Sequence, residues 1–487
     1  MKRTAIFYLL LLVVAGLGVF AVLRVGANLP APTAASGVTH VAAGIGVTTG
    51  PGAEASAVDS MLTSLRKNFD APLGHLFLQL LVIIGVSRVA GAIFTKLGQP
   101  SVVGEMAAGI LLGPSLFGLL APGAFQFVFP PSSLGTIKLL SQIGVCLFMF
   151  CVGMELNVAH VRSKAHAAVV VSHASIVFPY LLGVTLAYFL FTSLAASGTT
   201  FTAFALFMGI SMSITAFPVL ARILQERGLT QTALGSTAIT CAAVDDVTAW
   251  SLLAFVVAIA RATSVEASAL NLGLVAVFIG VMIWIVRPML PRLFGRALLE
   301  NEVPSKGVIA AVICVVVAAS FCTEVIGIHA LFGAFLAGTI MPDAGGFRQK
   351  LALRVENFSS VLLLPLFFVF IGLRTQITLL NDVTGWLLCL LVIAVATLGK
   401  LGGTAISARL TGMDWRESFQ LGALMNTRGL MELIALNIGY DLGILSPRIF
   451  AMLVVMALAT TMMTGPLLTL FGSRSGLKKA RLSSATP

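Results

Sequence analysis

The chain has 487 residues, of which 58% are hydrophobic and only 10% are charged, and its mean hydropathy is +1.02. Soluble domains carry charge on about a quarter of their residues, so this composition excludes a soluble protein and indicates an integral membrane protein. The net charge of +11 does not call for a nucleic-acid partner. An excess of Lys and Arg in cytoplasmic loops is the usual pattern of membrane proteins.

The chain begins with a basic pair followed by an apolar run over residues 4–23. Signal peptides and anchor helices share this pattern, and the length of the run favours a retained anchor over residues 1–26. Residues 27–71 are rich in Ala, Gly, Thr and Pro. They predict a flexible linker outside the cytoplasm.

Thirteen further apolar segments have about the length needed to cross a membrane. They lie at 72–95, 100–120, 135–154, 166–191, 201–220, 235–261, 267–287, 307–325, 328–341, 357–373, 384–405, 417–439 and 448–470. If the N-terminus is cytoplasmic and every segment crosses, most of the 30 Lys and Arg residues fall in cytoplasmic loops. The sequence therefore predicts an all-α polytopic membrane protein, with a transmembrane domain at 72–472 and a short cytoplasmic tail at 473–487.

The sixth segment contains the stretch TCAAVDDVTAW, in which Asp245 and Asp246 are adjacent and too deep to reach the membrane surface. A charge at the centre of a membrane helix costs about 2.5–3.5 kcal/mol on insertion scales, so such residues mark ion pathways or buried pairs. Adjacent helical positions point about 100° apart, so the two carboxylates face different partners. One can pair with a cation on a neighbouring helix while the other faces a cavity.

Lys400 is the only lysine deep in a segment, and the glycines of its stretch VATLGKLGGTA allow close helix approach. A permanent structural salt bridge between this lysine and an aspartate is one interpretation. The other is a titrating cluster that exchanges protons for a cation, with proton steps that belong to the cluster as a whole. The residues alone leave both open.

Two segments are interrupted by polar residues and by Pro or Gly. The interruptions contain Ser211, Ser213, Thr215 and Pro218 in the fifth segment, and Asn426, Thr427, Arg428 and Gly429 in the twelfth. These segments run in opposite directions in the charge-derived topology. Interrupted helices at corresponding places in two oppositely oriented halves indicate an inverted-repeat secondary transporter with its site near the midplane. An ordinary packed kink is the alternative for either break alone.

Three further buried charges need partners. Arg428 and Glu432 are four residues apart and can pair on one helix face. Glu105, in QPSVVGEMAAGILLGPS, lies among small residues and is a candidate to complete a buried network with Arg428. Arg88 is about two turns from the cytoplasmic end of its segment, where its side chain can reach the interface.

Five stretches in order resemble the monovalent cation:proton antiporter superfamily, in the branch called cation:proton antiporter-2. They are LGQPSVVGEMAAGILLGPSLFG, SITAFPVLARILQERGL, AAVDDVTAW, LGKLGGT and MNTRGLMELIALNIG. The resemblance covers nearly everything from Pro72 to Leu470. It implies a homodimer in which six core helices carry the ion against a static dimerisation domain, with the fifth and twelfth segments as crossed, unwound helices.

The resemblance also implies residue roles. Asp246 matches the essential aspartate that binds the monovalent cation and the proton in turn, and Asp245 matches the variable position before it. Lys400 matches the core lysine that pairs with Asp245, and Thr215 lies in the crossover. The resemblance thus implies Asp246, Asp245 and Thr215 as the ion- and proton-binding residues. The expected supporting polar network consists of Glu105, Asn426, Arg428 and Glu432.

The acid pair with a lysine is typical of electrogenic sodium/proton exchange, whereas the flanking TAW and NTRGLMELI are typical of an exchanger branch that often carries potassium. We therefore predict a secondary antiporter of the bacterial inner membrane that exchanges Na⁺ or K⁺ for H⁺ by alternating access, without a cofactor. A potassium/proton exchanger of the same superfamily and a passive cation channel are the alternatives. An intramembrane enzyme is disfavoured because none of the six histidines accompanies a serine or metal motif at depth.

Overall fold

The computed structural model describes residues 2–30, 71–155, 165–230, 232–261, 265–294, 305–342 and 346–471. The predicted linker at 27–71 lies almost entirely, and the predicted tail at 473–487 entirely, outside these residues. The described part is helical apart from turns, loops and one isolated antiparallel bridge between Ala195 and Leu445. The prediction of an all-α polytopic fold is confirmed.

Twelve of the described helical stretches are long and apolar enough to cross a membrane. The α-helices are α1 (Lys2–Gly26), α3 (Pro72–Lys96), α4 (Ser101–Leu112), α5 (Phe117–Leu120), α6 (Pro122–Val128), α7 (Leu134–Glu155), α9 (Ala165–Leu194), α10 (Phe201–Ser213), α11 (Phe217–Glu226), α12 (Ala233–Arg261), α13 (Val265–Val281), α14 (Arg287–Phe294), α15 (Lys306–Ile326), α16 (Ala330–Thr339), α17 (Phe347–Phe358), α18 (Leu364–Arg374), α19 (Val383–Leu410), α20 (Trp415–Met425), α21 (Leu430–Asp441) and α22 (Pro447–Phe471). Two predicted segments are not among the twelve: 328–341 forms only the short α16, and 417–439 is divided into α20 and α21.

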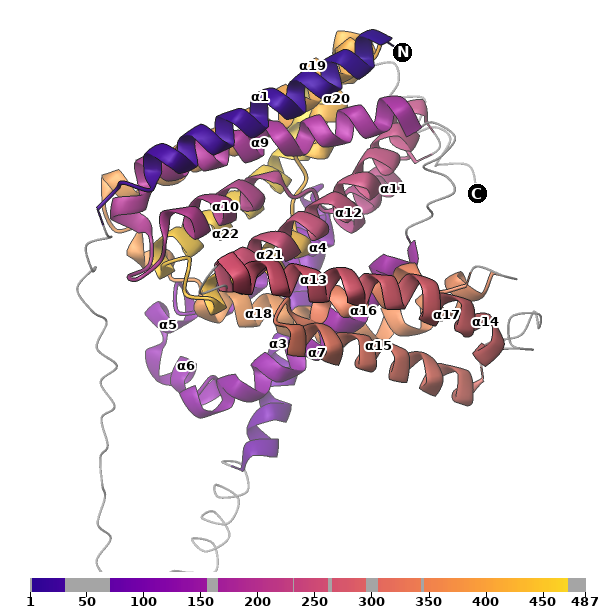
Figure 1. Cartoon of the computed structure of the whole chain (residues 1–487). Helices are drawn as coiled ribbons and strands as arrows, with labels where there is room; N and C mark the ends of the chain where they lie inside the picture. Colours follow the sequence, from indigo (N-terminus) through magenta and orange to yellow (C-terminus); the bar gives the residue numbers. More distant parts are fainter. Residues whose placement is uncertain are drawn as a thin grey trace, which may run out of the picture.

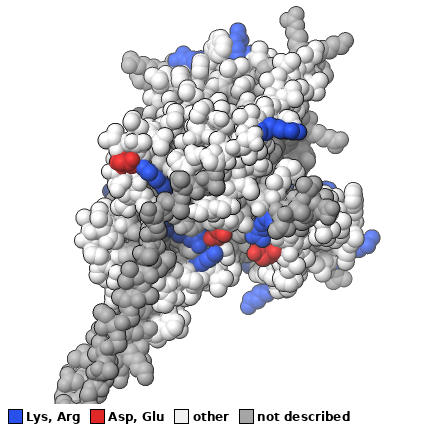
Figure 2. Space-filling view, turned by 60° about the vertical axis from the view of Figure 1, so that its left-hand side comes forward, with Lys and Arg blue, Asp and Glu red and all other residues white. Residues whose placement is uncertain are grey.

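The surface agrees with a membrane environment. On the face shown in Figure 2, most of the described surface belongs to uncharged residues, and the charged side chains lie in small groups. Large apolar side chains such as Leu81, Phe189 and Trp284 are strongly exposed. In water such a surface would be costly, whereas in lipid it is the expected one.

The helices form two groups (Figure 1). We call α9, α10, α11, α12, α19, α20, α21 and α22 the core bundle, and α3, α4, α7, α15, α16 and α18 the scaffold bundle, because the members of each group pack mainly against one another. α1 lies along α9 of the core bundle. Gly26 there is so close to the ring of Phe201 that a Cβ atom would clash with it. That residues 1–26 are retained as an anchor stays a prediction.

Both interruptions foreseen in the sequence are present, and they touch. α10 ends at Ser213 and α11 begins at Phe217, while α20 ends at Met425 and α21 begins at Leu430. Pro218 lies in the first turn of α11, where a missing N–H leaves no helical bond unmade. The backbone N–H of Ala216 donates to the carbonyl of Thr427 at 3.0 Å. The two unwound segments therefore meet inside the core bundle.

Candidate ion site at the crossed helices

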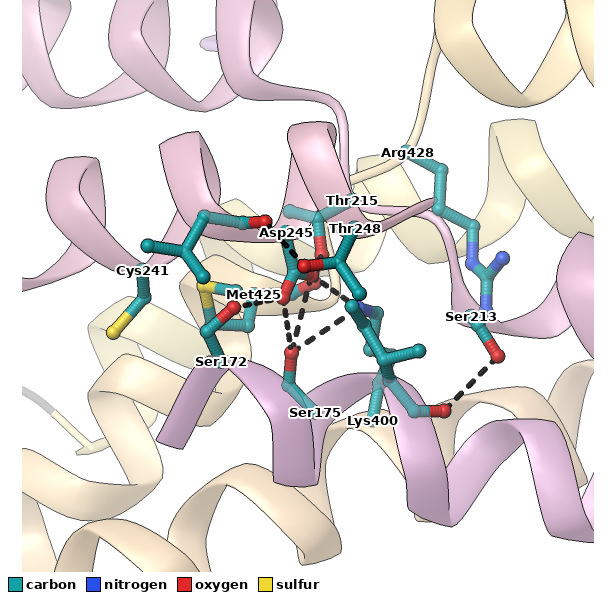
Figure 3. A network of polar contacts seen from close by, with 12 residues as sticks. Ser172, Ser175, Ser213, Thr215, Cys241, Asp245, Thr248, Lys400, Met425 and Arg428 are labelled. Carbon is teal, nitrogen blue, oxygen red and sulfur yellow. Dashed lines mark hydrogen bonds and ion pairs between the residues drawn. The ribbon is translucent and has the colours of Figure 1, made fainter. Parts of the chain in front are cut away.

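Asp245 on α12 is fully buried, and four side chains bind its carboxylate (Figure 3). Ser172 and Ser175 of α9 donate to Oδ1 at 2.7 and 3.0 Å. Thr215 of the first interruption donates to Oδ2 at 2.6 Å, and Nζ of Lys400 on α19 donates to the same atom at 2.9 Å. A carboxylate offers about four acceptor positions, so these donors satisfy its hydrogen-bonding capacity.

Lys400 is also fully buried and forms an ion pair with Asp245. The pairing depends on close approach of α19 to α9, which the glycines beside the lysine permit. A Cβ atom at Gly403 would lie 2.8 Å from the side chain of Phe178. An isolated charge at this depth would cost several kcal/mol, so each partner stabilises the other.

Asp246, the next residue on α12, is 1% exposed. Ala242 and Ala249, which share its helix face, are buried small residues. Both adjacent carboxylates are therefore buried, and the four donors described above bind Asp245. The sequence placed both aspartates in the site but did not reveal Ser172 and Ser175. Their three-residue spacing inside an apolar helix was the available signal.

Arg428, in the second interruption, supplies hydrogen bonds to the last carbonyls of α10, the helix that precedes the first interruption. Its Nη1 donates to the carbonyl of Ser211 at 2.7 Å, and its Nη2 donates to that of Met212 at 2.6 Å. The last carbonyls of a helix lack intrahelical partners and carry partial negative charge, so a buried guanidinium suits them. Nη1 also donates to Oε2 of Glu432 at 2.9 Å, which neutralises the guanidinium.

Side chains of α22 complete the second interruption, and the sequence did not indicate them. The backbone N–H of Arg428 donates to Oγ1 of Thr461 at 2.9 Å, and that hydroxyl shares its proton between the carbonyls of Arg428 and Ala457, each at 2.8 Å. The hydroxyls of Thr427 and Thr464 are 3.3 Å apart. Unwound backbone at membrane depth needs such partners, because no water supplies them.

Asn426, at the end of α20, is fully buried. Neither Oδ1 nor Nδ2 of its side chain has a hydrogen-bond partner within the part of the chain that the structure describes. The adjacent carbonyl of Met425 accepts a hydrogen bond from Thr215 at 3.1 Å, so this amide follows directly on the Asp245 cluster. An unsatisfied buried amide costs about 1–3 kcal/mol, which makes its oxygen a candidate ligand for a cation.

A cavity of about 510 Å³ lies between the two bundles. Its core-bundle wall includes Ala216, the residue after Thr215, and Leu430 at the start of α21. Its scaffold wall includes Phe148 and Phe368. The cavity therefore reaches the crossing of the interrupted helices.

Glu105 departs from the expectation. It was a candidate partner of Arg428, but the structure places it on the cavity wall, with its Oε1 3.5 Å from Nη1 of Arg88. Arg88 lies on α3, which packs against α4, and its side chain is 46% exposed. The expected supporting network is thus divided: Arg428 and Glu432 lie at the crossing, and Glu105 lies on the scaffold wall.

The fold and this buried site define a class of protein. Two interrupted helices that meet inside a membrane bundle beside buried ionisable side chains are the architecture of a secondary active transporter. Residues 64–472 match the family described as "Sodium/hydrogen exchanger, transmembrane", and the chain belongs to this family. Its members are transporters and not enzymes. The resemblance to monovalent cation:proton antiporters that the motifs indicated is confirmed.

Individual relatives add detail. The chain is 43% identical over 394 residues to the Na(+)/H(+) antiporter NhaS4 of Synechocystis sp., an alignment that covers 80% of this chain and 95% of that protein. It is 40% identical over 421 residues to cation/H(+) antiporter 17 of Arabidopsis thaliana, covering 85% of this chain and 51% of that protein. The sodium proton antiporter MjNhaP1 from Methanocaldococcus jannaschii has a similar structure, with a TM-score of 0.56 over 82% of this chain and 100% of that one. At 13% identity this likeness concerns the fold alone.

Proposed function

We propose that this protein exchanges Na⁺ for H⁺ across a membrane, with K⁺ as the alternative cation. The observation that carries the proposal is the buried ion pair of Asp245 and Lys400 beside Asp246, at the crossing of two interrupted helices. The relative named above as a sodium/proton antiporter supports sodium, and the plant relative is named only for a cation.

We assign the transported ions to Asp246. Asp245 already receives four donors, so a cation could reach its oxygens only by displacing one of them. An ionised carboxylate at Asp246 would attract a cation or a proton strongly, because charge is poorly screened at this depth. Cation and proton then compete for one group, and this competition couples their movements. Thr215 and the amide of Asn426 are candidates to supply further oxygens.

Alternating access is supported by the asymmetry between the two ends of the bundles. At one end the cavity separates the core bundle from the scaffold bundle. At the other end ion pairs join them: Asp441 of α21 binds Lys138 of α7 at 3.3 Å and Arg374 of α18 at 2.6 Å. Phe148 on the cavity wall and Lys138 are ten residues apart on α7, or about 15 Å along the helix. The positive-inside bias supports a cytoplasmic position for the cavity. In this proposal the core bundle moves against a scaffold bundle that forms a homodimer.

We expect electrogenic transport. Two acids and a lysine permit the exchange of more than one proton per cation, and such a ratio moves net charge. A net charge moved across the membrane is worth about 2.3 kcal/mol per 100 mV. Exchange measured at fixed ion gradients would then respond to an imposed potential. A passive cation channel, the alternative from another class, would conduct cations without obligatory proton countermovement.

The test is proton movement in proteoliposomes that hold an imposed pH gradient. We expect added Na⁺ to move protons through the wild type, and Asp246→Asn to reduce this movement to the level of empty vesicles. Asp414→Asn is the matched control, because Asp414 is exposed and caps α20 far from the site. Parallel measurements with K⁺ in place of Na⁺ show which cation the protein exchanges for protons. Full activity of Asp246→Asn would contradict the assignment, and cation flux without proton movement would favour the channel.

A further inference from the structure

Two ion pairs line the cavity, and each lies within one bundle. On the scaffold wall, Arg88 of α3 is 3.5 Å from Glu105 of α4. On the core wall, Arg222 binds Glu226 one turn further along α11 at 3.2 Å. We propose that Arg222 and Glu105 pair with each other when the cavity closes, and that this contact stabilises the conformation in which the opposite end is open. The inference rests on the alternating access of the proposed function and not on the identity of the cation.

The end opposite the cavity shows how the two bundles are joined when they meet. There the core bundle supplies an acid and the scaffold bundle supplies bases: Asp441 binds Lys138 at 3.3 Å and Arg374 at 2.6 Å. At the cavity the signs are reversed. Among the described residues that line it, Arg222 is the basic residue of the core wall and Glu105 is the acidic residue of the scaffold wall. Opposite charges of the two bundles therefore face each other at both ends.

Glu105 is able to accept a second cationic partner. The residue is only 5% exposed, and its contact with Arg88 uses one oxygen at 3.5 Å, which is long for a charge-assisted hydrogen bond. A carboxylate offers about four acceptor positions, so this contact leaves capacity for another donor. Arg222 is near enough across the cavity for its charge to act on the Glu105 carboxylate. Closure of the cavity would convert this longer-range attraction into a contact.

Arg222 needs an acid on the facing wall once the cavity closes. Its side chain is 48% exposed, and closure would replace water around it with apolar residues of the scaffold wall such as Phe148 and Phe368. A guanidinium that loses water must gain an anion or hydrogen-bond acceptors. Its Nε binds Glu226, but a guanidinium carries several N–H donors, so Arg222 can bind Glu105 without releasing Glu226.

The test needs a probe of the conformation in which the cavity is closed. Val145 of α7 is 1% exposed and lines a small pocket at the opposite end, together with Ile434 and Asn437 of α21. In the Val145→Cys variant, in a background without the native cysteines, a soluble maleimide reaches the thiol only when the bundles separate at that end. The labelling rate is then proportional to the population of the cavity-closed conformation.

We expect Glu105→Gln and Arg222→Gln each to slow this labelling about two- to fivefold, the effect of losing one partly exposed ion pair. The double variant should be no slower than either single variant, because both changes remove the same contact. Arg222→Lys keeps the positive charge and should retain the wild-type rate. If Glu105→Gln does not fold, Arg222→Gln compared with Glu226→Gln decides the matter alone.

Glu226→Gln and Arg88→Gln are the matched controls, because each breaks an ion pair of the open cavity but leaves Arg222 and Glu105 charged. Both should label at the wild-type rate. Equal rates in all variants, or an equal slowing in Glu226→Gln, would overturn the inference while leaving the antiporter intact. Labelling of Val145→Cys in no variant would refute alternating access and the inference with it. Failure of the wild type to move protons would instead refute the proposed exchange.

Discussion

A lysine inside a membrane bundle needs an anion, and Lys400 obtains one from Asp245 at 2.9 Å with both side chains fully buried. Breaking a buried pair from one side leaves an uncompensated charge, whereas replacing both partners by neutral groups removes the problem. The three hydroxyls on Asp245 reduce the cost of leaving it unpaired but cannot supply an opposite charge. The contributions of Asp245 and Lys400 to stability are therefore coupled to each other.

We predict that Lys400→Met lowers the free energy of unfolding by about 3–5 kcal/mol. Adding Asp245→Asn to this variant should recover a substantial part of the loss, because neither group is then charged. Thermal unfolding in detergent measures both changes. Lys138→Met serves as the comparison, since that lysine is partly exposed and its loss should cost at most about 1 kcal/mol. Additive effects of the two core substitutions would argue against coupling.

At the scale of helices, the two interruptions are stable because other elements satisfy their backbone. Arg428 binds the carbonyls at the end of α10, and Thr461 of α22 binds both backbone groups of Arg428. Local sequence explains why the helices break, since Pro218 follows the first interruption closely and Gly429 ends the polar run of the second. It does not explain what replaces the lost helical hydrogen bonds, which come from residues 33 or more positions away.

Thr461→Val keeps the shape of the side chain but removes its hydroxyl from the unwound segment. We expect a loss of about 1–2 kcal/mol in unfolding free energy and slower exchange, because the N–H and carbonyl of Arg428 lose a shared partner. Thr460→Val is the matched control: Thr460 is equally buried on α22, but it donates to carbonyls of its own helix at Met456 and Ala457. Equal effects of both variants would show that Thr461 has no special role at the break.

At the scale of the whole molecule, two ion pairs join the bundles at the end away from the cavity. Asp441 and Asn437 of α21 bind Arg374 of α18, and Asp441 also binds Lys138 of α7. On the cavity walls, Arg222 instead pairs with a residue of its own helix. This distribution favours the conformation in which the cavity end is open.

Asp441→Asn should shift the population away from that conformation. We expect a cysteine placed on the cavity wall at Ala221 to react about two- to fivefold more slowly with an impermeant maleimide, in a background without the native cysteines. Asp382→Asn is the control, because its partner Arg448 belongs to the same bundle. Unchanged or faster labelling in Asp441→Asn would show that these ion pairs do not hold the closed end.

Much of this site can be predicted from the sequence because its features depend on short stretches of the chain. Deep acids, a deep lysine and two polar interruptions stand out against an apolar background, and the cost of burying charge makes each of them informative. The spacing of Arg428 and Glu432 likewise predicts a contact within one helix, which the structure contains. Glu105 shows the limit, because its partner Arg88 lies on another helix and was expected to reach the interface instead.

The sequence by itself determined the membrane class, the helical fold, the two broken helices and the positions of the buried charges, since these depend on hydropathy and on short-range backbone preferences. Only the tertiary structure decided which groups meet: Ser172 and Ser175 on Asp245, and Thr461 on the unwound backbone of Arg428. Such contacts depend on how each helix is rotated and how closely it approaches its neighbours. Those quantities are fixed by packing across the whole bundle, and no stretch of the chain encodes them alone.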